Sequence, residues 1–390
     1  MRYDLAPKRG FTLAEYEKRL YKAQKLMLSY QIDALFLTSP SNFRYFSGFD
    51  SQFWESPTRP WYLIVPLKGK PIAVIPEIGA SAMKVTWLED IRTWSSPNPK
   101  DDGVSLLKST LAGCARRFGR IGAEFGREMS IRMPVLDLLE LRKIISSEMV
   151  DGSPMIWELR MIKTAAEVNH IEYICKLVSD AFHELPEKIT IGETEREAAL
   201  KLRIDILKRG ADSTPFLPAI SGRGGVSQIV CGPSNRVLDK GDILFIDTGS
   251  TYDGYFCDFD RNFAISKVSS EAARVNDLLW RATEAGITAA VPGATTKDIW
   301  LSMNKVIEEE GKIGNNVGRL GHGVGLQLTE PPSLRIDDNT LISENMVLTI
   351  EPGIEYQLGK MIVHEENIVV TQDGAKLLTK RAPRDIPVIN

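Results

Sequence analysis

Residues 241–265 read GDILFIDTGSTYDGYFCDFDRNFAI, in which two apolar, β-branched runs flank the turn sequence Thr-Tyr-Asp-Gly. This pattern predicts a β-hairpin, and Gly254 can supply a positive φ in its turn. Asp247 lies on one arm and Asp258 on the other. A turn centred on Tyr-Asp places Asp247 opposite Asp258, whereas a turn one residue later places Asp247 opposite Asp260. In either register Asp247 and Asp258 share one face of the hairpin.

Two carboxylates on one strand face need a compensating positive charge. Asp is disfavoured in strands, and a desolvated anion without a partner is costly. The sequence offers two sources of this positive charge. The neighbouring side chains Lys240 and Arg261 can pair with the acids at a rim, or a metal ion can bind between them.

Length and composition limit the class of protein. A chain of 390 residues is too long for one ordinary core, so two domains are expected. The net charge is −3 with both signs interspersed, which argues against a nucleic-acid partner. Neither a signal peptide nor a membrane span is indicated, so a cytoplasmic protein without a membrane partner is expected. The four scattered cysteines argue against a disulfide framework and a thiolate zinc site.

The first domain is expected at residues 1–155. Thr12 and Glu15 have the spacing of a capping box that begins a helix. The apolar runs DALFL, WYLIV, PIAVI and RIGAEF then alternate with turns and helical segments, which predicts α/β layers.

A stretch rich in aromatic residues, Pro and Ser interrupts this alternation at residues 39–61. It predicts a long loop, and loops of this length inside a domain are often functional. Trp54, Arg59 and Trp61 are either packing residues or part of a lid that reaches a substrate.

The second domain is expected at residues 156–390 and contains an internal repeat. The pattern Gly-x-Thr-x-x-acid opens a helix at residues 192–197 and again at 293–298. The first copy leads to the acidic hairpin, and the second leads to the strand-forming runs MVLTIEPGIEY and MIVHEENIVVT. A chain that folds twice into one unit can pack its halves about a pseudo-twofold axis, with the acidic strands meeting at the centre.

The second half adds three residues of interest: Glu351 in Ile-Glu-Pro-Gly, Glu365 in Val-His-Glu-Glu-Asn and His322 in Leu-Gly-His-Gly-Val-Gly. Together with Asp247 and Asp258, in this order, they resemble the motifs of the pita-bread metallopeptidases: methionine aminopeptidase, aminopeptidase P, prolidase and creatinase. The resemblance covers nearly the whole chain. It implies a small N-terminal creatinase-like α/β domain, a C-terminal pita-bread domain and a set of five metal ligands.

The resemblance also implies a chemistry and a substrate. Four carboxylates and one imidazole suit two divalent ions, with manganese expected and cobalt, iron or zinc admitted. Such ions generate a nucleophile from water and polarise a carbonyl, while Glu351 and His322 have catalytic roles and Glu351 carries a proton. The implied activity is hydrolysis of Xaa-Pro dipeptides by a homodimer, in which the Trp54 and Arg59 loop of a partner subunit can close the site.

The chain departs from the family peptidases at three places. They usually have a His in the loop before the first acidic strand, and here SGRGGVSQIVCGPSNR has none. They have another seven residues after the metal-binding His, where this chain has Thr329. Each such donor is worth roughly 3 kcal/mol in a transition state. Asp260 stands where relatives commonly have Thr or Ser, and it can be an additional ligand, an acceptor behind the ligands or a partner of Arg261.

These departures keep two other functions open. The missing imidazoles favour a non-peptidase that acts on a small osmolyte or amidine, similar to creatinase or to the dimethylsulfoniopropionate lyases of this fold. Cys-Gly-Pro in the loop and Thr329 resemble the lyases. A catalytically silent binding protein is the third possibility. The complete ligand set argues against it, because five polar groups held together are costly without a function.

Overall fold

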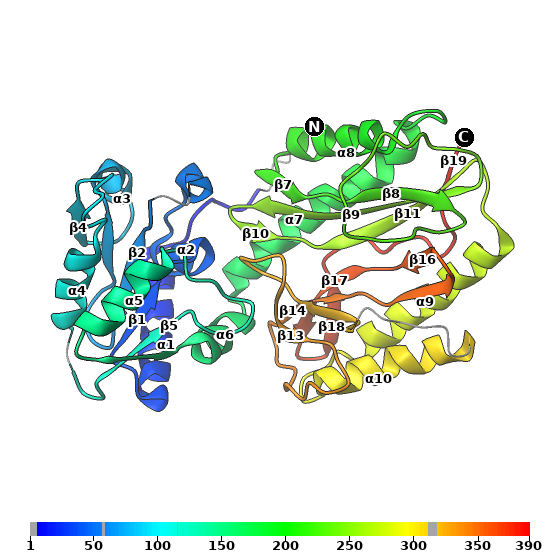
Figure 1. Ribbon diagram of the computed structural model, residues 1–390. Helices are drawn as coiled ribbons and strands as arrows, with labels where there is room; N and C mark the ends of the chain where they lie inside the picture. Colours follow the sequence, from blue (N-terminus) through cyan, green and yellow to red (C-terminus); the bar gives the residue numbers. More distant parts are fainter. Residues whose placement is uncertain (1–5, 57–58, 115, 311–317) are drawn as a thin grey trace. The chain divides into compact units, whose positions relative to one another are not determined.

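The computed structural model (Figure 1) describes residues 6–56, 59–114, 116–310 and 318–390. The chain forms two compact units. One comprises Lys8–Arg160, and the other comprises Met161–Asn390 together with the first residues of the chain. Both units combine helices with strands, which confirms the predicted fold class. Within the described ranges, no helix is long and apolar enough to cross a membrane.

The N-terminal unit contains a mixed sheet. Its strands are β1 (Ala34–Leu37), β2 (Tyr62–Pro66), β3 (Ile72–Pro76), β4 (Asp90–Trp94), β5 (Arg120–Ala123) and β6 (Glu148–Asp151). Its helices are α1 (Leu13–Tyr30), α2 (Pro40–Ser47), α3 (Ala80–Met83), α4 (Val104–Ala112), α5 (Val135–Ile144) and α6 (Ser153–Met161), with short 3₁₀ helices η1 (Gln52–Glu55) and η2 (Glu77–Gly79). The strand order is β4-β3-β2-β1-β5-β6, and the four apolar runs identified in the sequence form β1, β2, β3 and β5. The predicted α/β layers are therefore confirmed.

Only half of the capping box predicted at the start of α1 forms. The Thr12 hydroxyl accepts the Glu15 N–H at 3.3 Å, as predicted. The Glu15 carboxylate instead lies 3.4 Å from Nε of Arg19. Arg19 is 1% exposed, and a buried guanidinium without a nearby acid costs more free energy than a helix end without a second cap.

The prediction of a long loop at residues 39–61 is wrong for much of that stretch, because it contains α2 and η1. Trp61 is buried, stacks on Phe49 at 5.0 Å between ring centroids, and lies 5.7 Å from Trp54. The Arg59 guanidinium lies 5.3 Å from the centre of the Phe53 ring. These contacts, all inside the N-terminal unit, favour the packing interpretation of the aromatic residues.

The C-terminal unit contains two sheets and a hairpin. Its strands are β7 (Ser213–Phe216), β8 (Ala219–Arg223), β9 (Asp242–Tyr252), β10 (Tyr255–Phe256), β11 (Phe259–Ile265), β12 (Gly321–Gly323), β13 (Glu330–Ser333), β14 (Val347–Ile350), β15 (Gly353–Gln357), β16 (Lys360–Val363), β17 (Glu366–Thr371), β18 (Gly374–Leu377) and β19 (Val388–Ile389). Its helices are α7 (Ala165–Glu184), α8 (Glu195–Arg209), α9 (Ser270–Ala289) and α10 (Thr296–Ile307), with η3 (Leu185–Glu187) and η4 (Glu308–Glu310). One sheet has the order β10-β9-β11-β19, with β7 and β8 also paired to β9; the other has the order β13-β12-β14-β17-β18. Figure 1 shows these strands between the helix pair α7–α8 and the pair α9–α10.

The internal repeat predicted from the sequence is visible where the second helix of each half begins, at α8 and at α10. Thr194 and Glu197 form a complete capping box at α8, and Thr295 and Asp298 form one at α10. Each capping threonine also makes an isolated antiparallel bridge to a later segment, at Val237 and at Leu341 respectively. The two halves of this unit therefore begin with the same local structure.

The hairpin adopts the second of the two registers that the sequence left open. Asp260 pairs with Asp247, and Tyr255 pairs with Tyr252. Asp253 and Gly254 occupy the turn with φ of 49° and 78°, the two positive values that a type I′ turn requires.

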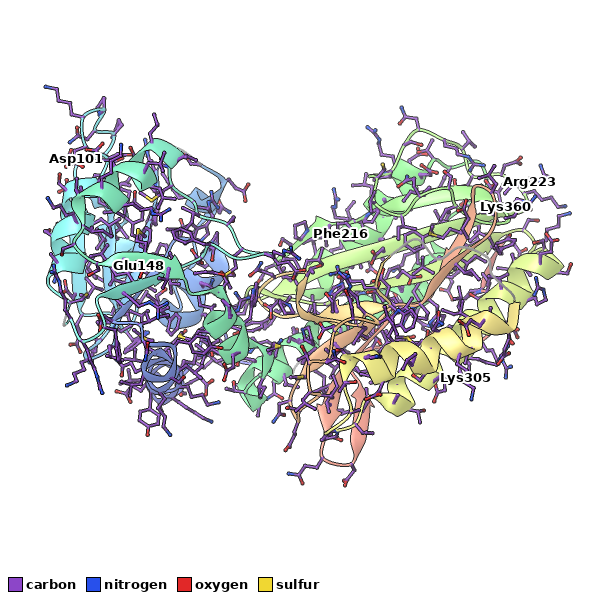
Figure 2. All side chains as sticks on the ribbon, turned by 60° about the horizontal axis from the view of Figure 1, so that its bottom comes forward. Asp101, Glu148, Phe216, Arg223, Lys305 and Lys360 are labelled. Atoms are coloured by element: carbon purple, nitrogen blue, oxygen red, sulfur yellow. The ribbon has the colours of Figure 1, made fainter. Side chains whose placement is uncertain are left out.

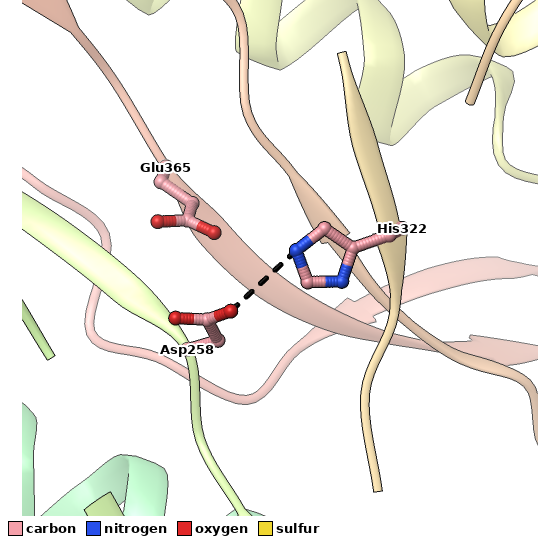
Figure 3. A group of neighbouring side chains, drawn as sticks. All are labelled: Asp258, His322 and Glu365. Atoms are coloured by element: carbon pink, nitrogen blue, oxygen red, sulfur yellow. Dashed lines mark ion pairs between the residues drawn. The ribbon is translucent and has the colours of Figure 1, made fainter. Parts of the chain in front are cut away.

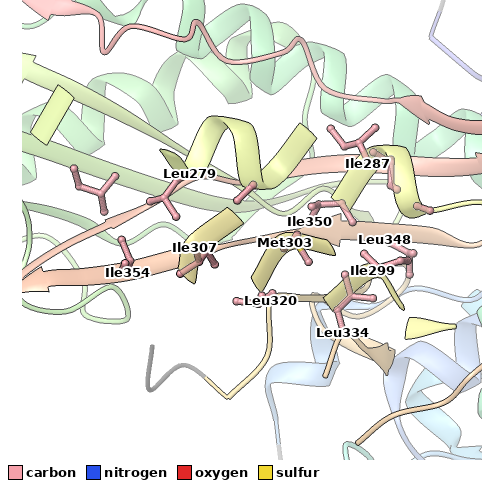
Figure 4. Packing of buried hydrophobic residues seen from close by; sticks show 14 of the residues in the cluster. Leu279, Ile287, Ile299, Met303, Ile307, Leu320, Leu334, Leu348, Ile350 and Ile354 are labelled. Carbon is pink, nitrogen blue, oxygen red and sulfur yellow. The ribbon is translucent and has the colours of Figure 1, made fainter. Parts of the chain in front are cut away.

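The apolar core of the C-terminal unit lies between α9, α10 and the second sheet. Figure 4 shows Leu279 from α9, together with Ile299 and Met303 from α10, against Leu348 and Ile350 of β14. The hairpin β15–β16 adds Ile354 and Ile362 to this core, and its Met361 makes an isolated bridge with Val226, beyond the end of β8. Figure 2 accordingly shows Lys360 beside Arg223. The hairpin thus connects the second half of the unit to the first.

Candidate metal centre

The five predicted ligands come from both halves of the C-terminal unit. Asp247 lies inside β9, and His322 is the middle residue of β12. Asp258 lies in the break between β10 and β11. The sequence placed Glu351 and Glu365 inside strands, but both occupy breaks, Glu351 directly after β14 and Glu365 directly before β17.

Each of these two breaks has a structural cause. Pro352 follows Glu351 and has no N–H to donate to a strand ladder. At Glu365 the chain changes its pairing partner, because β16 pairs with β15 whereas β17 pairs with β14. Because these acids lie outside the regular ladders, the alternation of side chains along a strand does not fix the direction in which they point.

Three of the five residues form a close group. Asp258, His322 and Glu365 each offer one ligand atom, and these atoms all lie within 4.8 Å of one another (Figure 3). Nε2 of His322 is 3.5 Å from Oδ2 of Asp258. Asp247 and Glu351 are not members of this close group, but the charge of each raises the pKa of both Asp258 and Glu365. The structure therefore places all five in one electrostatic neighbourhood.

His322 is arranged as a neutral donor. Its Nδ1 lies 2.8 Å from the carbonyl oxygen of Gly323, a contact that places the proton on Nδ1. Burial, followed by the charge of Arg319, lowers the pKa of His322 to about 3. The imidazole is consequently uncharged at neutral pH, and Nε2 presents a lone pair toward Asp258, as a metal-binding His does.

The acids cannot all be ionised without a cation. Burial and the charge of Glu351 raise the pKa of Asp247 to about 8, and desolvation raises the pKa of Glu351 to about 7. Burial also raises the pKa of Asp258 and of Glu365 well above the ordinary range. A bound divalent ion would favour the charged form of each acid.

The donor atoms fit such an ion. Oδ1 of Asp247 and Oδ1 of Asp258 are buried, and neither has a hydrogen-bond partner in the part of the chain that the structure describes. A buried oxygen left in this state costs about 1 to 3 kcal/mol. Carboxylate oxygens with free lone pairs are the ligands that manganese and other hard divalent ions prefer.

Pairing with Lys240 and Arg261, the alternative drawn from the sequence, is wrong. The Arg261 guanidinium lies 3.0 Å from the Glu366 carboxylate and donates to the carbonyl oxygens of Glu365 and Lys380. It reaches Asp260 only through the main-chain carbonyl oxygen. Lys240 is exposed. Neither side chain neutralises the acids of the hairpin.

Neighbouring residues hold the ligands in place. The Asn367 side chain clamps the main chain of Asp258, accepting its N–H at 2.9 Å and donating to its carbonyl oxygen at 2.5 Å. The Thr349 hydroxyl donates to the Glu365 carboxylate. His364 turns away from the acids, with Nδ1 2.9 Å from the hydroxyl of Thr283 on α9. These contacts orient the ligands independently of any bound ion.

Gly321 allows β12 to approach β14 closely, and we expect a Gly321→Ala variant to lose stability. Its φ is 137°, and an added Cβ would lie 2.2 Å from the carbonyl oxygen of Thr349. Strain and steric overlap together predict a loss of about 3 kcal/mol in the free energy of unfolding, measured by urea denaturation. Gly374→Ala is the matched control, because Gly374 has φ 138° with nothing within 4 Å of its added Cβ. Equal losses in the two variants would show that backbone strain alone acts at Gly321.

Sequence reasoning missed Arg319. The charge of this half-buried side chain opposes the rise that burial causes in the pKa of Asp258 and of Glu351, and it adds to the fall that burial causes in the pKa of His322. Arg319 therefore lies beside the acid group. Its Nη2 donates to the hydroxyl of Thr329 at 3.4 Å. Arg319 stands three residues before His322, outside the quoted motif, and no local pattern distinguishes it from a surface arginine.

Comparisons with known proteins identify the family of this chain. The chain matches the metallopeptidase family M24 over residues 169–372 and the creatinase/prolidase N-terminal domain over residues 19–162. It is 30% identical over 367 residues to the Xaa-Pro dipeptidase of Pyrococcus furiosus, which covers 93% of this chain and 98% of that protein.

Two solved structures share the whole architecture. The prolidase from Thermococcus sibiricus has a TM-score of 0.85 at 25% identity, over 97% of this chain and 100% of that one. The dipeptidase PepE from Mycobacterium ulcerans has a TM-score of 0.84 at 27% identity, over 97% of this chain and 99% of that one. These similarities confirm the predicted creatinase-like domain followed by a pita-bread domain.

Proposed function

This chain belongs to the metallopeptidase family M24, and on that premise we propose that it is a metal-dependent dipeptidase that releases proline from Xaa-Pro dipeptides. The observation that carries the proposal is the close group of Asp258, His322 and Glu365, beside carboxylate oxygens of Asp247 and Asp258 that have no hydrogen-bond partner within the described ranges. Family membership favours this activity over an osmolyte lyase or a silent binding protein.

Asp247, Asp258, His322, Glu351 and Glu365 would hold two divalent ions, of which manganese suits an oxygen-rich set. When bound, the ions activate water and polarise the scissile carbonyl group. Manganese, the homodimer and the cytoplasmic location stay predictions. Metal analysis and light scattering of the purified protein test the first two.

Glu351 is the residue that we assign to proton transfer. Burial raises the pKa of Glu351 to about 7 in the metal-free protein, and a bound ion would favour the charged carboxylate, which is the form that accepts a proton. Glu351 takes the proton from the attacking water and passes it to the nitrogen of the leaving proline. His322, neutral and held by Gly323, contributes a lone pair and no proton.

Arg319 is suited to bind the free carboxylate of a dipeptide. It is a cation beside the acid group, and it contacts Thr329, which occupies the place of the second family histidine. A charge-assisted hydrogen bond to a substrate carboxylate is worth about 1.5 to 3 kcal/mol.

We therefore expect Arg319→Met to raise KM for Xaa-Pro dipeptides by about 10- to 100-fold. The same variant should cleave the corresponding Xaa-Pro amides, which lack the carboxylate, with nearly the wild-type kcat/KM. Arg335→Met serves as the control, because Arg335 is exposed and paired with Asp337. If kcat/KM falls equally for dipeptides and for amides, the charge of Arg319 acts on the carboxylates of the site and does not bind the substrate.

The proposed function is tested by measuring free proline released from a panel of Xaa-Pro dipeptides by manganese-loaded protein. Metal content is determined on the same sample. Rapid release that is lost on chelation and restored by manganese supports the proposal. A protein that holds metal but releases no proline from any dipeptide contradicts it, and product analysis with non-peptide substrates becomes the next step.

A further inference from the structure

Asp260 lies on the same face of the acidic hairpin as the proposed ligands. It is 2% exposed and pairs directly with Asp247 across β9 and β11. Asp258 lies two residues earlier, in the break before β11, and burial together with the charges of neighbouring acids, Asp260 among them, raises its pKa, so the two carboxylates are neighbours. Directly paired residues have Cβ atoms about 5 Å apart, so the carboxylates of Asp247 and Asp260 can reach one common ion.

One oxygen of Asp260 has a partner and the other has none. Oδ2 accepts a hydrogen bond from the Asn262 amide at 3.2 Å, and that amide also donates to the carbonyl oxygen of Val363 at 2.6 Å. Oδ1 is buried and unpartnered among the residues that the structure describes, a property it shares with Oδ1 of Asp247 and Oδ1 of Asp258. Asn262 therefore fixes the orientation of a carboxylate whose second oxygen remains available.

The nearest guanidinium supplies only part of the charge that Asp260 needs, because burial and the charge of Asp247 raise the pKa of Asp260 well above its ordinary range although the charge of Arg261 opposes this rise. Arg261 is adjacent in sequence, but its side chain is committed to the Glu366 carboxylate at 3.0 Å. A buried carboxylate whose nearest cation is paired with another acid is costly, whereas a metal ion supplies both the charge and the ligand contact that Oδ1 lacks.

We propose that Asp260 is an additional ligand of the metal centre, binding through Oδ1 the ion that Asp247 also binds, and that it makes the site of this chain selective for manganese over zinc. The inference rests on the proposed metal centre, but it does not depend on the identity of the substrate. A fifth carboxylate raises the number of oxygen donors, which suits manganese. Zinc prefers four ligands and a larger share of nitrogen or sulfur.

The test is direct measurement of metal affinity in metal-free protein, by calorimetric titration and competition with a chelator. Asp260→Thr removes the carboxylate, and Asp260→Asn keeps its shape and its hydrogen bond while removing the charge. Both variants should bind one manganese ion at least about 10-fold more weakly than wild type, with zinc affinity changed by less than about 3-fold. Asp239→Asn is the control, because it removes an exposed carboxylate from the segment just before β9.

The outcomes separate this inference from the proposed function. Wild-type manganese affinity in both Asp260 variants overturns it. Equal losses for manganese and zinc overturn the proposed selectivity. A wild-type protein that binds neither ion removes the metal centre itself, and with it the proposed function. Circular dichroism of the metal-free variants shows whether a weaker affinity comes from misfolding, and Asp260→Asn decides the matter if Asp260→Thr does not fold.

Discussion

Replacing Asp258 with asparagine is expected to lower kcat/KM for Xaa-Pro dipeptides by at least about a thousandfold, since loss of metal-assisted catalysis costs several kcal/mol in the transition state. Asp258 lies 3.5 Å from Nε2 of His322, measured from its Oδ2. It belongs to the close group with His322 and Glu365, and its Oδ1 has no hydrogen-bond partner among the residues that the structure describes. Proline release and the metal content of the purified variant are measured together, and both should fall.

The stability of the metal-free Asp258→Asn variant separates loss of a ligand from loss of the fold. Asp258 is buried among like charges that raise its pKa, so removing its charge should leave the metal-free protein at least as stable as wild type. Asp373→Asn, at an exposed turn of the same unit, is the control for the loss of one negative charge. An Asp258→Asn protein that keeps its full metal content and its activity would remove Asp258 from the ligand set.

Local sequence signals were sufficient for the hairpin and for several helix starts. Asp253 and Gly254 form the dipeptide that a type I′ turn prefers, and their positive φ values decide the register that the apolar pattern leaves open. The capping threonines Thr194 and Thr295 could be identified from the sequence, because a capping residue and its acid lie only three residues apart.

The α2 segment shows a local signal that composition concealed. Ser39 followed by Pro40 is a helix-start signal, but the many aromatic, Pro and Ser residues favoured a loop. A distant residue also contributes: the buried Glu124 carboxylate accepts the Thr38 N–H at 2.7 Å and the Asn42 amide at 2.6 Å.

The positions of the second pair of acids depend on contacts that sequence spacing does not encode. Glu351 and Glu365 were identified by their motifs, yet their placement in breaks follows from which strands pair, β14 with β17 and β15 with β16. The partner of Arg261 is Glu366, 105 residues later in the chain. Arg319 reaches the acid group only in the folded chain. The motifs were therefore sufficient to propose the five ligands, whereas the charges around them could not be predicted from the sequence.

The largest loss of stability outside the site is expected from Glu366→Ala. Glu366 is 0% exposed, and its carboxylate accepts hydrogen bonds from Arg261, Thr379, Arg381 and the Ala382 N–H. Removing it leaves the buried Arg261 without its anion, which costs about 3 to 5 kcal/mol. For a unit of this size the thermal midpoint of the metal-free protein should fall by roughly 10 °C.

An exposed ion pair in the same unit provides the comparison. Glu172 and Lys376 lie 2.6 Å apart, closer than Glu366 and Arg261, but their side chains are 40% and 56% exposed. Glu172→Ala should therefore cost less than about 1 kcal/mol. The double variant Arg261→Met, Glu366→Met should recover part of the loss, because an unpaired buried charge is more costly than no charge at all. If Glu172→Ala and Glu366→Ala lower the thermal midpoint equally, burial does not set the strength of the Glu366 pair.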